Sequence, residues 1–327
     1  MTPASRRTIL AASAGLGASL ASGPALSQSG AVSTATASSR QQPGFYRLKV
    51  GEAEITVVHD GFAARRAQGL VRNVPLPEVE EALRSHFIDP DAMENPYNVA
   101  VVTIGSRNYV IDAGFADNGP ATTGQVAANM RAAGIDPASI NGVLVTHFHP
   151  DHINGLRRKD GSLVYPNAEI HVPEAEWAYW MDDGRMSQTP EAQRGAFLLS
   201  RRVFGPIAAQ VRRFSPGAEV VPGIQSLATP GHTPGHTSFI VASGSAKALV
   251  QGDVSGIPSL FVERPGWHSI FDLDVATAEA TRRSVYDMAA VERMPIIGYH
   301  FPFPAVGYVT RAGSGYRFGL AQWRSSI

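Results

Sequence analysis

The chain has 327 residues, with 28 basic and 28 acidic side chains, ten histidines and no cysteine. The lack of cysteine excludes disulfide scaffolds, thiolate metal sites and cysteine nucleophiles, so any transition-metal site must use histidine and carboxylate. The formal net charge of zero gives no electrostatic basis for a nucleic-acid partner.

The first 27 residues differ in composition from the rest of the chain. Arg6 and Arg7 precede a short apolar run over residues 9–20, which is rich in small residues and followed by an acceptable cleavage site. This order predicts a secretory signal peptide over residues 1–27. Because the arginine pair directly abuts the apolar run, we favour the twin-arginine export route over an ordinary signal. The run is too short for a membrane anchor, so we expect a periplasmic protein.

Residues 28–43 are small and polar and predict a disordered leader to a folded domain at 44–327. Hydrophobic periodicity predicts strands that alternate with helices in this domain. The predicted strands cover residues 45–50, 54–59, 97–104, 108–112, 142–146, 168–172, 224–228, 238–241, 247–251, 296–298, 306–310 and 316–318. The predicted helices cover residues 77–87, 125–133, 174–181, 192–214 (interrupted at Gly205-Pro206) and 275–291, which Asp274 is expected to cap. No long polar linker divides them, so we expect one domain of sheets covered by helices.

A dense cluster of metal-type donors follows the predicted strand at 142–146. His147, His149, Asp151 and His152 supply four nitrogen and oxygen donors within six residues. Alternation places His147 and His149 on one side of an extended backbone, and Asp151 is expected to help cap a following helix. Four donors in so short a stretch are too many for one tetrahedral ion, so they indicate two adjacent ions. The donor types suit zinc and also iron, manganese or cobalt.

Further donors follow predicted strands later in the chain. His232 and His236 lie in a loop fixed by glycine and proline, while Asp253 and His300 each follow a later strand. Because open sheets carry their ligand sites at strand ends, we expect these side chains to meet the first cluster. Their order also disfavours the simpler interpretation of a surface histidine cluster with no ligand role.

These motifs resemble those of the metallo-β-lactamase-fold hydrolases, and most closely the group of methyl parathion hydrolase and its lactonase-like relatives. The H-x-H-x-D-H motif at residues 147–152 is specific to the superfamily. The segments that indicate the subgroup are 45–47, 59–61, 111–114, 165–168, 231–236, 252–253 and 315–318. The resemblance implies an α/β fold of the α+β type, an αββα four-layer sandwich with a two-metal site at the sheet edge.

The resemblance also assigns the ligands. By analogy, one ion would be held by His147, His149 and His232, the other by Asp151, His152 and His300, with Asp253 bridging both. It implies two divalent ions, with Zn preferred, and a hydroxide between them as the nucleophile. Asp151 and Asp253 would then be catalytic as ligands or by orienting the hydroxide, and not as free bases. The sequence itself does not indicate an oligomeric state; the resemblance is compatible with a homodimer, because dimers are common in the family.

Other polar side chains have supporting or ambiguous roles. We expect His236 to hydrogen-bond its own loop and not to bind metal. Asp60 and Asp112 fit equally well as supports for ligands and as strand-end caps. The scattered arginine pairs, Arg282-Arg283 among them, are expected on solvated faces.

The expected partner is a small apolar or aryl substrate. No lysine or cysteine is placed to protonate a leaving group, so good leaving groups are favoured in a phosphotriester, lactone or aryl ester. From the resemblance, Trp180 and Phe197 are expected to line the substrate pocket, and Trp267 lies on another loop that could form a wall with Phe261 and Phe271. The alternatives are a β-lactam hydrolase or a mononuclear iron oxygenase of the same fold. A non-enzymatic binding module is disfavoured, because every ligand position is filled.

Overall fold

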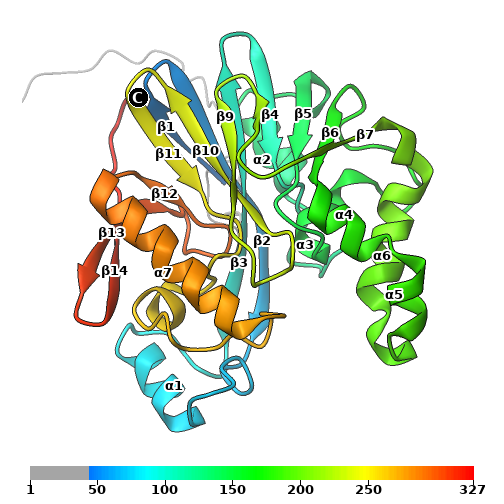
Figure 1. Cartoon of the computed structure of the whole chain (residues 1–327). Helices are drawn as coiled ribbons and strands as arrows, with labels where there is room; N and C mark the ends of the chain where they lie inside the picture. Colours follow the sequence, from blue (N-terminus) through cyan, green and yellow to red (C-terminus); the bar gives the residue numbers. More distant parts are fainter. Residues whose placement is uncertain (1–43) are drawn as a thin grey trace, which may run out of the picture. The chain divides into compact units, whose positions relative to one another are not determined.

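Two seven-stranded sheets form the centre of residues 44–327, the part of the chain that the computed structural model describes (Figure 1). The first sheet contains β1 (Phe45–Val50), β2 (Ala53–Arg65), β3 (Met93–Ile104), β4 (Arg107–Ile111), β5 (Ile140–Leu144), β6 (Glu169–Pro173) and β7 (Val211–Phe214), in that order. The second contains β14 (Gly315–Leu320), β13 (Val306–Ala312), β12 (Ile296–Ile297), β11 (Ala246–Val250), β10 (Thr237–Ser243), β9 (Ile224–Ala228) and β8 (Glu219–Val221). The expected signal peptide (1–27) and leader (28–43) lie outside the described residues.

Helices cover the outer faces of the two sheets. The α-helices are α1 (Leu76–Arg84), α2 (Val126–Ala132), α3 (Pro150–Ile153), α4 (Glu174–Trp180), α5 (Asp183–Gln188), α6 (Gly195–Phe204) and α7 (Val275–Glu292). Helices α2, α3, α4 and α6 contribute to one core with the first sheet. Helix α7 packs on the second sheet, against β13 among other strands. Within the described residues, no helix is both long and apolar enough to span a bilayer.

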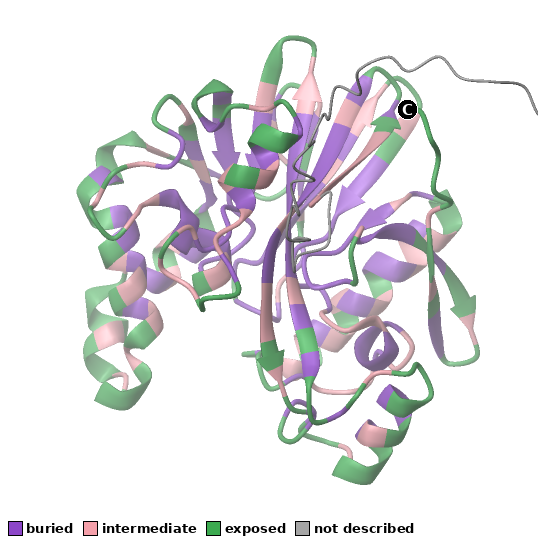
Figure 2. Ribbon diagram, turned by 180° about the vertical axis from the view of Figure 1, so that it is seen from behind, coloured by how far each residue is buried: buried purple, intermediate pink, exposed green. Residues whose placement is uncertain are grey.

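Strand β3 shows why the layers stack. Val99 and Val101 belong to the core beneath the helices, whereas Ala100 and Val102 belong to the core between the sheets. Successive side chains of a strand point to opposite faces, so an apolar run such as this one is buried on both sides. Buried residues accordingly follow the central strands (Figure 2). The expected αββα four-layer sandwich is confirmed.

Most predicted elements are present, and two need correction. Residues 211–214 of the predicted helix form β7 instead, because they pair in parallel with β6. Asp151 does not cap a helix: His149 precedes α3, and Asp151 lies within its first turn with its side chain directed elsewhere. Helix α5 and strand β8 were not predicted. The cap of α7 is confirmed, since the carboxylate of Asp274 accepts the backbone N–H of Thr277 at 3.0 Å.

A small third core lies beside the sandwich. It joins α1 to the short helix η5 (Pro258–Val262) and includes Leu70, Leu83 and Phe261. The loop after β2 is tied to the loop after η5, because the N–H of Ile270 donates to the carbonyl oxygen of Leu70 at 2.9 Å. These two loops therefore stand together at the same end of the molecule as the metal-type donors described next.

Candidate metal centre

The side chains expected as ligands meet at the ends of four strands. His147 and His149 follow β5, Asp151 and His152 lie in α3, His232 lies between β9 and β10, Asp253 follows β11, and His300 follows β12. They form two groups that share Asp253, and in each group the donor atoms all lie within 4.8 Å of one another. The three-histidine group is His147, His149, His232 and Asp253, and the two-carboxylate group is Asp151, His152, Asp253 and His300.

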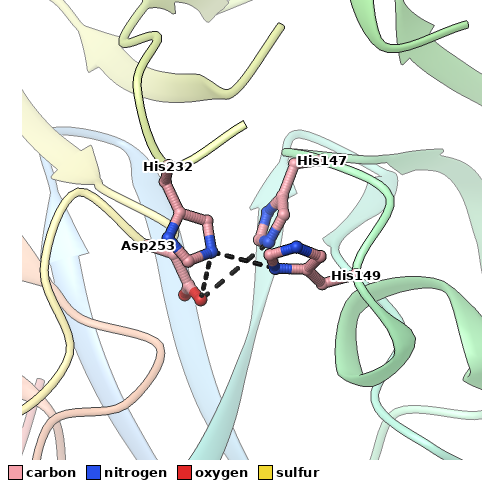
Figure 3. A group of neighbouring side chains, drawn as sticks. All are labelled: His147, His149, His232 and Asp253. Atoms are coloured by element: carbon pink, nitrogen blue, oxygen red, sulfur yellow. Dashed lines mark hydrogen bonds and ion pairs between the residues drawn. The ribbon is translucent and has the colours of Figure 1, made fainter. Parts of the chain in front are cut away.

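The three-histidine group converges on one point (Figure 3). Nε2 of His232 lies 2.9 Å from Nδ1 of His149 and 3.4 Å from Oδ2 of Asp253. Nε2 of His147 lies 3.9 Å from the same Asp253 oxygen. This nitrogen is buried and has no hydrogen-bond partner.

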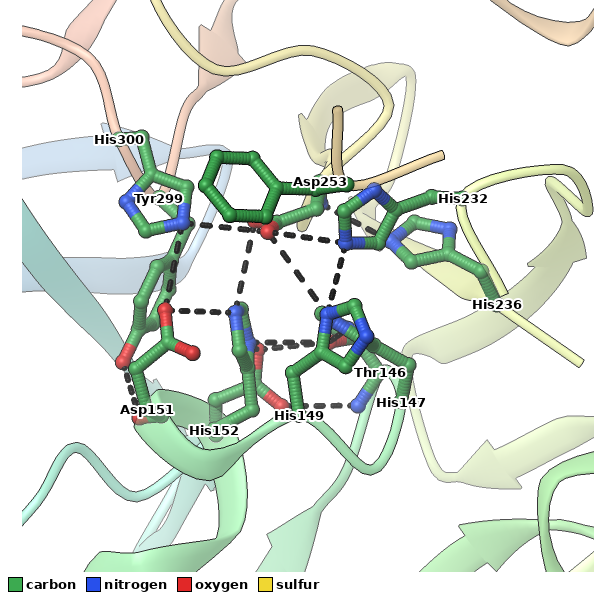
Figure 4. A network of polar contacts seen from close by, with 12 residues as sticks. Thr146, His147, His149, Asp151, His152, His232, His236, Asp253, Tyr299 and His300 are labelled. Atoms are coloured by element: carbon green, nitrogen blue, oxygen red, sulfur yellow. Dashed lines mark hydrogen bonds and ion pairs between the residues drawn. The ribbon is translucent and has the colours of Figure 1, made fainter. Parts of the chain in front are cut away.

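The two-carboxylate group lies on the other side of Asp253 (Figure 4). Nε2 of His300 is 3.1 Å from Oδ2 of Asp253 and 3.2 Å from Oδ2 of Asp151. Nε2 of His152 is 3.3 Å from Oδ2 of Asp151 and 3.5 Å from Oδ1 of Asp253. Both Nε2 of His152 and Oδ1 of Asp253 are buried without a hydrogen-bond partner.

These orphaned atoms test whether metal ions fit the site. Buried polar atoms are almost always hydrogen-bonded. Nε2 of His147, Nε2 of His152 and Oδ1 of Asp253 are not, so these three atoms require another partner, such as a metal ion. Imidazole nitrogen and carboxylate oxygen, four to a group, are a ligand set that divalent transition metals prefer. The residues present therefore fit two divalent ions.

Asp112 anchors the two-carboxylate group from behind. Its Oδ2 lies 2.7 Å from Nδ1 of His152, and it accepts hydrogen bonds from the backbone and the hydroxyl group of Thr146, both at 2.8 Å. Asp112 has a φ of +63°, a left-handed conformation that Asp tolerates better than most residues. Asp60 instead accepts backbone hydrogen bonds from Phe115 and Val126. The two roles that the sequence left open are thus divided: Asp112 supports a ligand, and Asp60 holds loops.

His236 supports the backbone of Asp253. Its Nδ1 lies 3.0 Å from the carbonyl oxygen of Thr229, and its Nε2 accepts the N–H of Asp253 at 2.9 Å. Gly252 has a φ of +57°, and a Cβ there would lie 2.8 Å from Nε2 of His236. His236 is therefore engaged at both nitrogens, which agrees with its expected structural role.

Two carboxylates were missed by the sequence reasoning. Glu176, fully buried in α4, accepts the N–H groups of Phe148 at 2.9 Å and Gly235 at 2.7 Å, and so joins two ligand-bearing loops. Its signal was an acidic residue one turn before Trp180 on the buried face of an aromatic helix. Asp272 accepts from Nδ1 of His232 at 3.1 Å, and no local pattern in the sequence marked it.

Charge divides the two groups. Burial lowers the pKa of His147 well below its usual value and lowers that of His149 to about 3. Burial also acts on His300, but the carboxylates of Asp253 and Asp151 outweigh it and raise its pKa to about 10. The same carboxylates, with Asp112, raise the pKa of His152 well above its usual value against the effect of burial.

A cavity of about 280 Å³ opens onto both groups. It is lined on the metal side by His149, Asp151, His232, Asp253 and His300, and elsewhere mainly by Arg65, Leu70, Tyr97, Phe115, Ile257, Phe261 and Phe271. Of the five expected wall residues, Phe261 and Phe271 are among them.

The expectation for Trp180, Phe197 and Trp267 needs correction, because none of them is among the described residues that line this cavity. Trp180 and Phe197 are 5% and 4% exposed and belong to the core beneath the first sheet. Trp267 packs against the small third core, with the guanidinium group of Arg264 5.0 Å from the centre of its ring. Arg282, expected on a solvated face, is also buried, at 1% exposure.

Comparison with known proteins identifies similar chains. The model of the metallo-beta-lactamase superfamily matches residues 93–300. The N-acyl homoserine lactonase AttM of Agrobacterium fabrum is 30% identical over 128 residues, which are 37% of this chain and 43% of that protein. An N-acyl homoserine lactonase of a Bacillus species is 29% identical over 134 residues, 38% of this chain and 46% of that protein. The match thus spans less than half of each of these relatives.

Solved structures match over more of the chain. The crystal structure of the hydrolase AbOPH of the beta lactamase superfamily has a TM-score of 0.82 and 26% identity, and the match covers 88% of this chain and 100% of that one. AidC, a dizinc quorum-quenching lactonase in complex with its product, has a TM-score of 0.81 and 22% identity, covering 86% and 99%. At 22% identity, the match to AidC shows a shared fold and nothing more.

Proposed function

The chain belongs to the metallo-beta-lactamase superfamily, and from this premise we propose that it is a two-metal hydrolase of ester-type bonds, with lactones as the first substrate class. One observation carries the proposal: two ligand groups share Asp253 and open into a single cavity. The lactonases among the similar proteins support lactones ahead of aryl phosphotriesters and aryl esters.

The two groups would each hold one divalent ion. We propose Zn, because imidazole and carboxylate are its usual ligands when cysteine is absent. Bound in this position, such ions polarise a carbonyl or phosphoryl oxygen and lower the pKa of water toward neutrality. Asp253 links the two groups, because its Oδ1 faces His152 of one group and its Oδ2 faces His232 of the other. Asp151 lines the cavity and faces His152 and His300, so it would be a ligand of the second ion.

Apolar side chains would hold the rest of the substrate. Leu70, Ile257, Phe261 and Phe271 form an apolar wall of the cavity. Leu70 and Phe271 lie on the two loops that are tied together, whereas Ile257 directly precedes η5 and Phe261 lies within it. Ligand pockets of this kind bind by apolar burial and take their specificity from a few polar groups. A short acyl chain or an aryl ring suits this wall.

Arg65 and Tyr97 are two of the polar residues that line the cavity, in addition to Asn95, Ser255, Ser269, Asp272 and Arg282. The Arg65 guanidinium group lies 5.0 Å from the centre of the Phe271 ring, and its buried Nε has no hydrogen-bond partner. Tyr97 packs edge-on against His300, with ring centres 5.4 Å apart. Burial and the charge of Asp151 raise the pKa of Tyr97, so its hydroxyl group keeps its proton at neutral pH. Both residues can donate hydrogen bonds to oxygens of the substrate.

An assay panel tests the proposal. Protein loaded with Zn, Mn or Fe is offered an acyl-homoserine lactone, an aryl lactone, an aryl phosphotriester, an aryl ester and a β-lactam. We expect the highest kcat/KM on a lactone with Zn. Failure to turn over any ester or lactone with any of the metals refutes the proposal, and turnover of the β-lactam alone favours the β-lactam hydrolase.

A matched pair of variants tests the cavity wall. Phe271→Leu shortens a side chain that lines the cavity, and Trp267→Phe alters a neighbour on the same loop that does not. We expect Phe271→Leu to raise KM by roughly tenfold, the loss of about 1–2 kcal/mol of apolar contact, while Trp267→Phe leaves KM unchanged. Equal effects of the two substitutions contradict this wall.

We also propose export to the periplasm, supported by the order of charged, apolar and small residues in residues 1–27. Replacing Arg6 and Arg7 together by lysine is expected to retain the protein in the cytosol, as measured by cell fractionation. The control is the same replacement at Arg212 and Arg213, a pair with largely exposed side chains on β7. Cytosolic, uncleaved wild-type protein contradicts the proposal.

A further inference from the structure

Arg282 is an enclosed cation that the proposed chemistry does not use. It lies on α7 at 1% exposure, and Nη2 donates to Oδ2 of Asp272 at 3.0 Å. Asp272 is itself only 2% exposed, and its other oxygen lies 3.1 Å from Nδ1 of His232. The buried charge pair therefore ends on a side chain of the three-histidine group.

The remaining donors of Arg282 bind two further segments. Nε donates to the carbonyl oxygen of Val254 at 3.1 Å, directly after Asp253. Nη1 donates to the carbonyl oxygens of Pro265 at 2.8 Å and Trp267 at 3.2 Å, in the loop between η5 and Asp272. One guanidinium group thus connects the loop with Asp272, the segment with Asp253 and, through Asp272, the His232 ring.

The backbone around His232 is fixed at the same place. The N–H of Leu273 donates to the carbonyl oxygen of His232 at 3.1 Å, and that of Asp274 donates to Gly231 at 2.9 Å. Gly231 has a φ of +126°, and a Cβ there would lie 2.3 Å from the backbone nitrogen of Ala278 in α7. The loop of His232 is therefore held against the start of α7, so that its ring can rotate only about its own side-chain bonds.

Burying a charge is costly unless it is paired and its hydrogen-bonding capacity is met. Here the planar guanidinium group satisfies an anion and three carbonyl groups at once, which the point charge of lysine does not reproduce. Asp272, held in turn, directs Nδ1–H of His232 toward itself. Nε2 of His232 is then left facing His149 and Asp253.

We propose that Asp272 and Arg282 are positioning residues that fix the ring and tautomer of His232 and thereby set the metal affinity of the three-histidine group. The inference rests on the proposed two-metal function only in requiring that this group binds an ion. The histidines of the two-carboxylate group have their own supports, since Asp112 faces Nδ1 of His152 and the carbonyl oxygen of Pro96 faces Nδ1 of His300.

The test measures metal affinity without substrate. Zn binding is followed by chelator competition and elemental analysis in a His300→Ala background, where the three-histidine group is the only complete set of donors within residues 44–327. We expect Asp272→Asn to weaken that binding by about 10–100-fold, the usual effect of losing the partner of a ligating histidine. In a His147→Ala background, which leaves the two-carboxylate group complete, the same substitution is expected to change affinity less than threefold.

Matched variants separate positioning from general damage. Arg282→Gln is compared with Arg283→Gln on the same helix, since Arg283 is half-exposed and bonds Glu279 and the carbonyl oxygen of Ser314. We expect a loss of affinity with the first and none with the second. The double variant Asp272→Asn/Arg282→Gln is expected to lose little more than the worse single variant, because both act through one ring.

Several outcomes would overturn the proposal: unchanged affinity in folded Asp272→Asn, equal losses at both groups, or equal effects of Arg282→Gln and Arg283→Gln. Folding is checked by circular dichroism of the metal-free variants. If Asp272→Asn does not fold, Arg282→Lys provides the same test. This variant keeps the charge but loses the planar guanidinium group, so a smaller loss of metal affinity is expected. If the wild type binds Zn but cleaves no ester or lactone, the proposed function is refuted. The metal affinities of the variants then still test the positioning role of Asp272 and Arg282.

Discussion

The two ligand groups share one carboxylate and lie side by side, yet they differ in charge and in support. The three-histidine group has one carboxylate for three imidazoles, and burial keeps His147 and His149 neutral near pH 7. The two-carboxylate group has two carboxylates for two imidazoles, and their charges raise the pKa of His152 and His300 despite burial. The difference teaches that a metal ion must displace protons from the cationic His152 and His300 at the second group, whereas His147 and His149 of the first group are uncharged before it binds.

Substitution of Asp253 is expected to affect both ligand groups at once and so to have the largest effect. Asp253→Ala removes an oxygen from both groups, so we expect loss of two-metal occupancy and a fall in kcat/KM of about a thousandfold or more. Elemental analysis and steady-state kinetics measure the two effects. Asp272→Asn is the comparison variant, because it leaves Asp253 in place and is expected to weaken metal binding at the three-histidine group only. Retention of two ions by Asp253→Ala contradicts the sharing of this carboxylate.

Asp112→Asn tests the support of the two-carboxylate group separately from that of the three-histidine group. Asparagine can still accept the N–H of Thr146 but loses the second carboxylate oxygen that faces Nδ1 of His152. We expect the affinity of the two-carboxylate group for Zn to fall by about 10–100-fold, with the three-histidine group unchanged. This pattern is the reverse of that expected for Asp272→Asn. The same pattern for both variants removes the distinction between the two supports.

The charge difference predicts different pH dependence. Because the raised pKa values keep His152 and His300 protonated at neutral pH, their protons compete with the ion, and affinity rises as pH rises toward about 10. Each displaced proton contributes about tenfold per pH unit at the two-carboxylate group, whereas His147 and His149, whose lowered pKa values keep them neutral, contribute little change in affinity between pH 6 and 8. Calorimetric titrations in buffers of different ionisation enthalpy count the protons released. Equal release at both groups contradicts the prediction.

Substitution of Glu176 is expected to produce the smallest difference in metal affinity between the two groups. Glu176→Gln places an amide N–H against the backbone donors of Phe148 or Gly235, both of which lie in loops of the three-histidine group. We expect a loss of about 1–3 kcal/mol in the free energy of unfolding of the metal-free protein, measured by urea denaturation. Metal affinity should fall slightly at the three-histidine group and not at the other. Glu174→Gln, exposed on the same helix, is the control.

The fold and the ligand positions were accessible from the sequence because their signals are local. The apolar run in residues 99–102 and the spacing of residues 275–291 reflect which side chains face a core, whatever that core contains. Residues 211–214 show the limit: their pattern continued that of a helix, and only pairing with β6 made them a strand. Asp112 shows another, since its sequence context suited a strand cap as well as a histidine partner.

The sequence by itself determined the kind of site, because His147 to His152 are contiguous and the other donors follow strands whose ends must meet. Only the tertiary structure decided what holds those donors and what surrounds them. Asp272 is 40 residues from His232, and Arg282 is 28 residues from the Val254 carbonyl group that it binds. Which face of α4 is buried depends on the elements packed against it, and this packing places Trp180 in the core. Phe271, on a loop that is tied to the one after β2, lines the cavity instead. Contacts between distant segments leave no periodic trace in a chain, and they appear only when the two sheets bring those segments together.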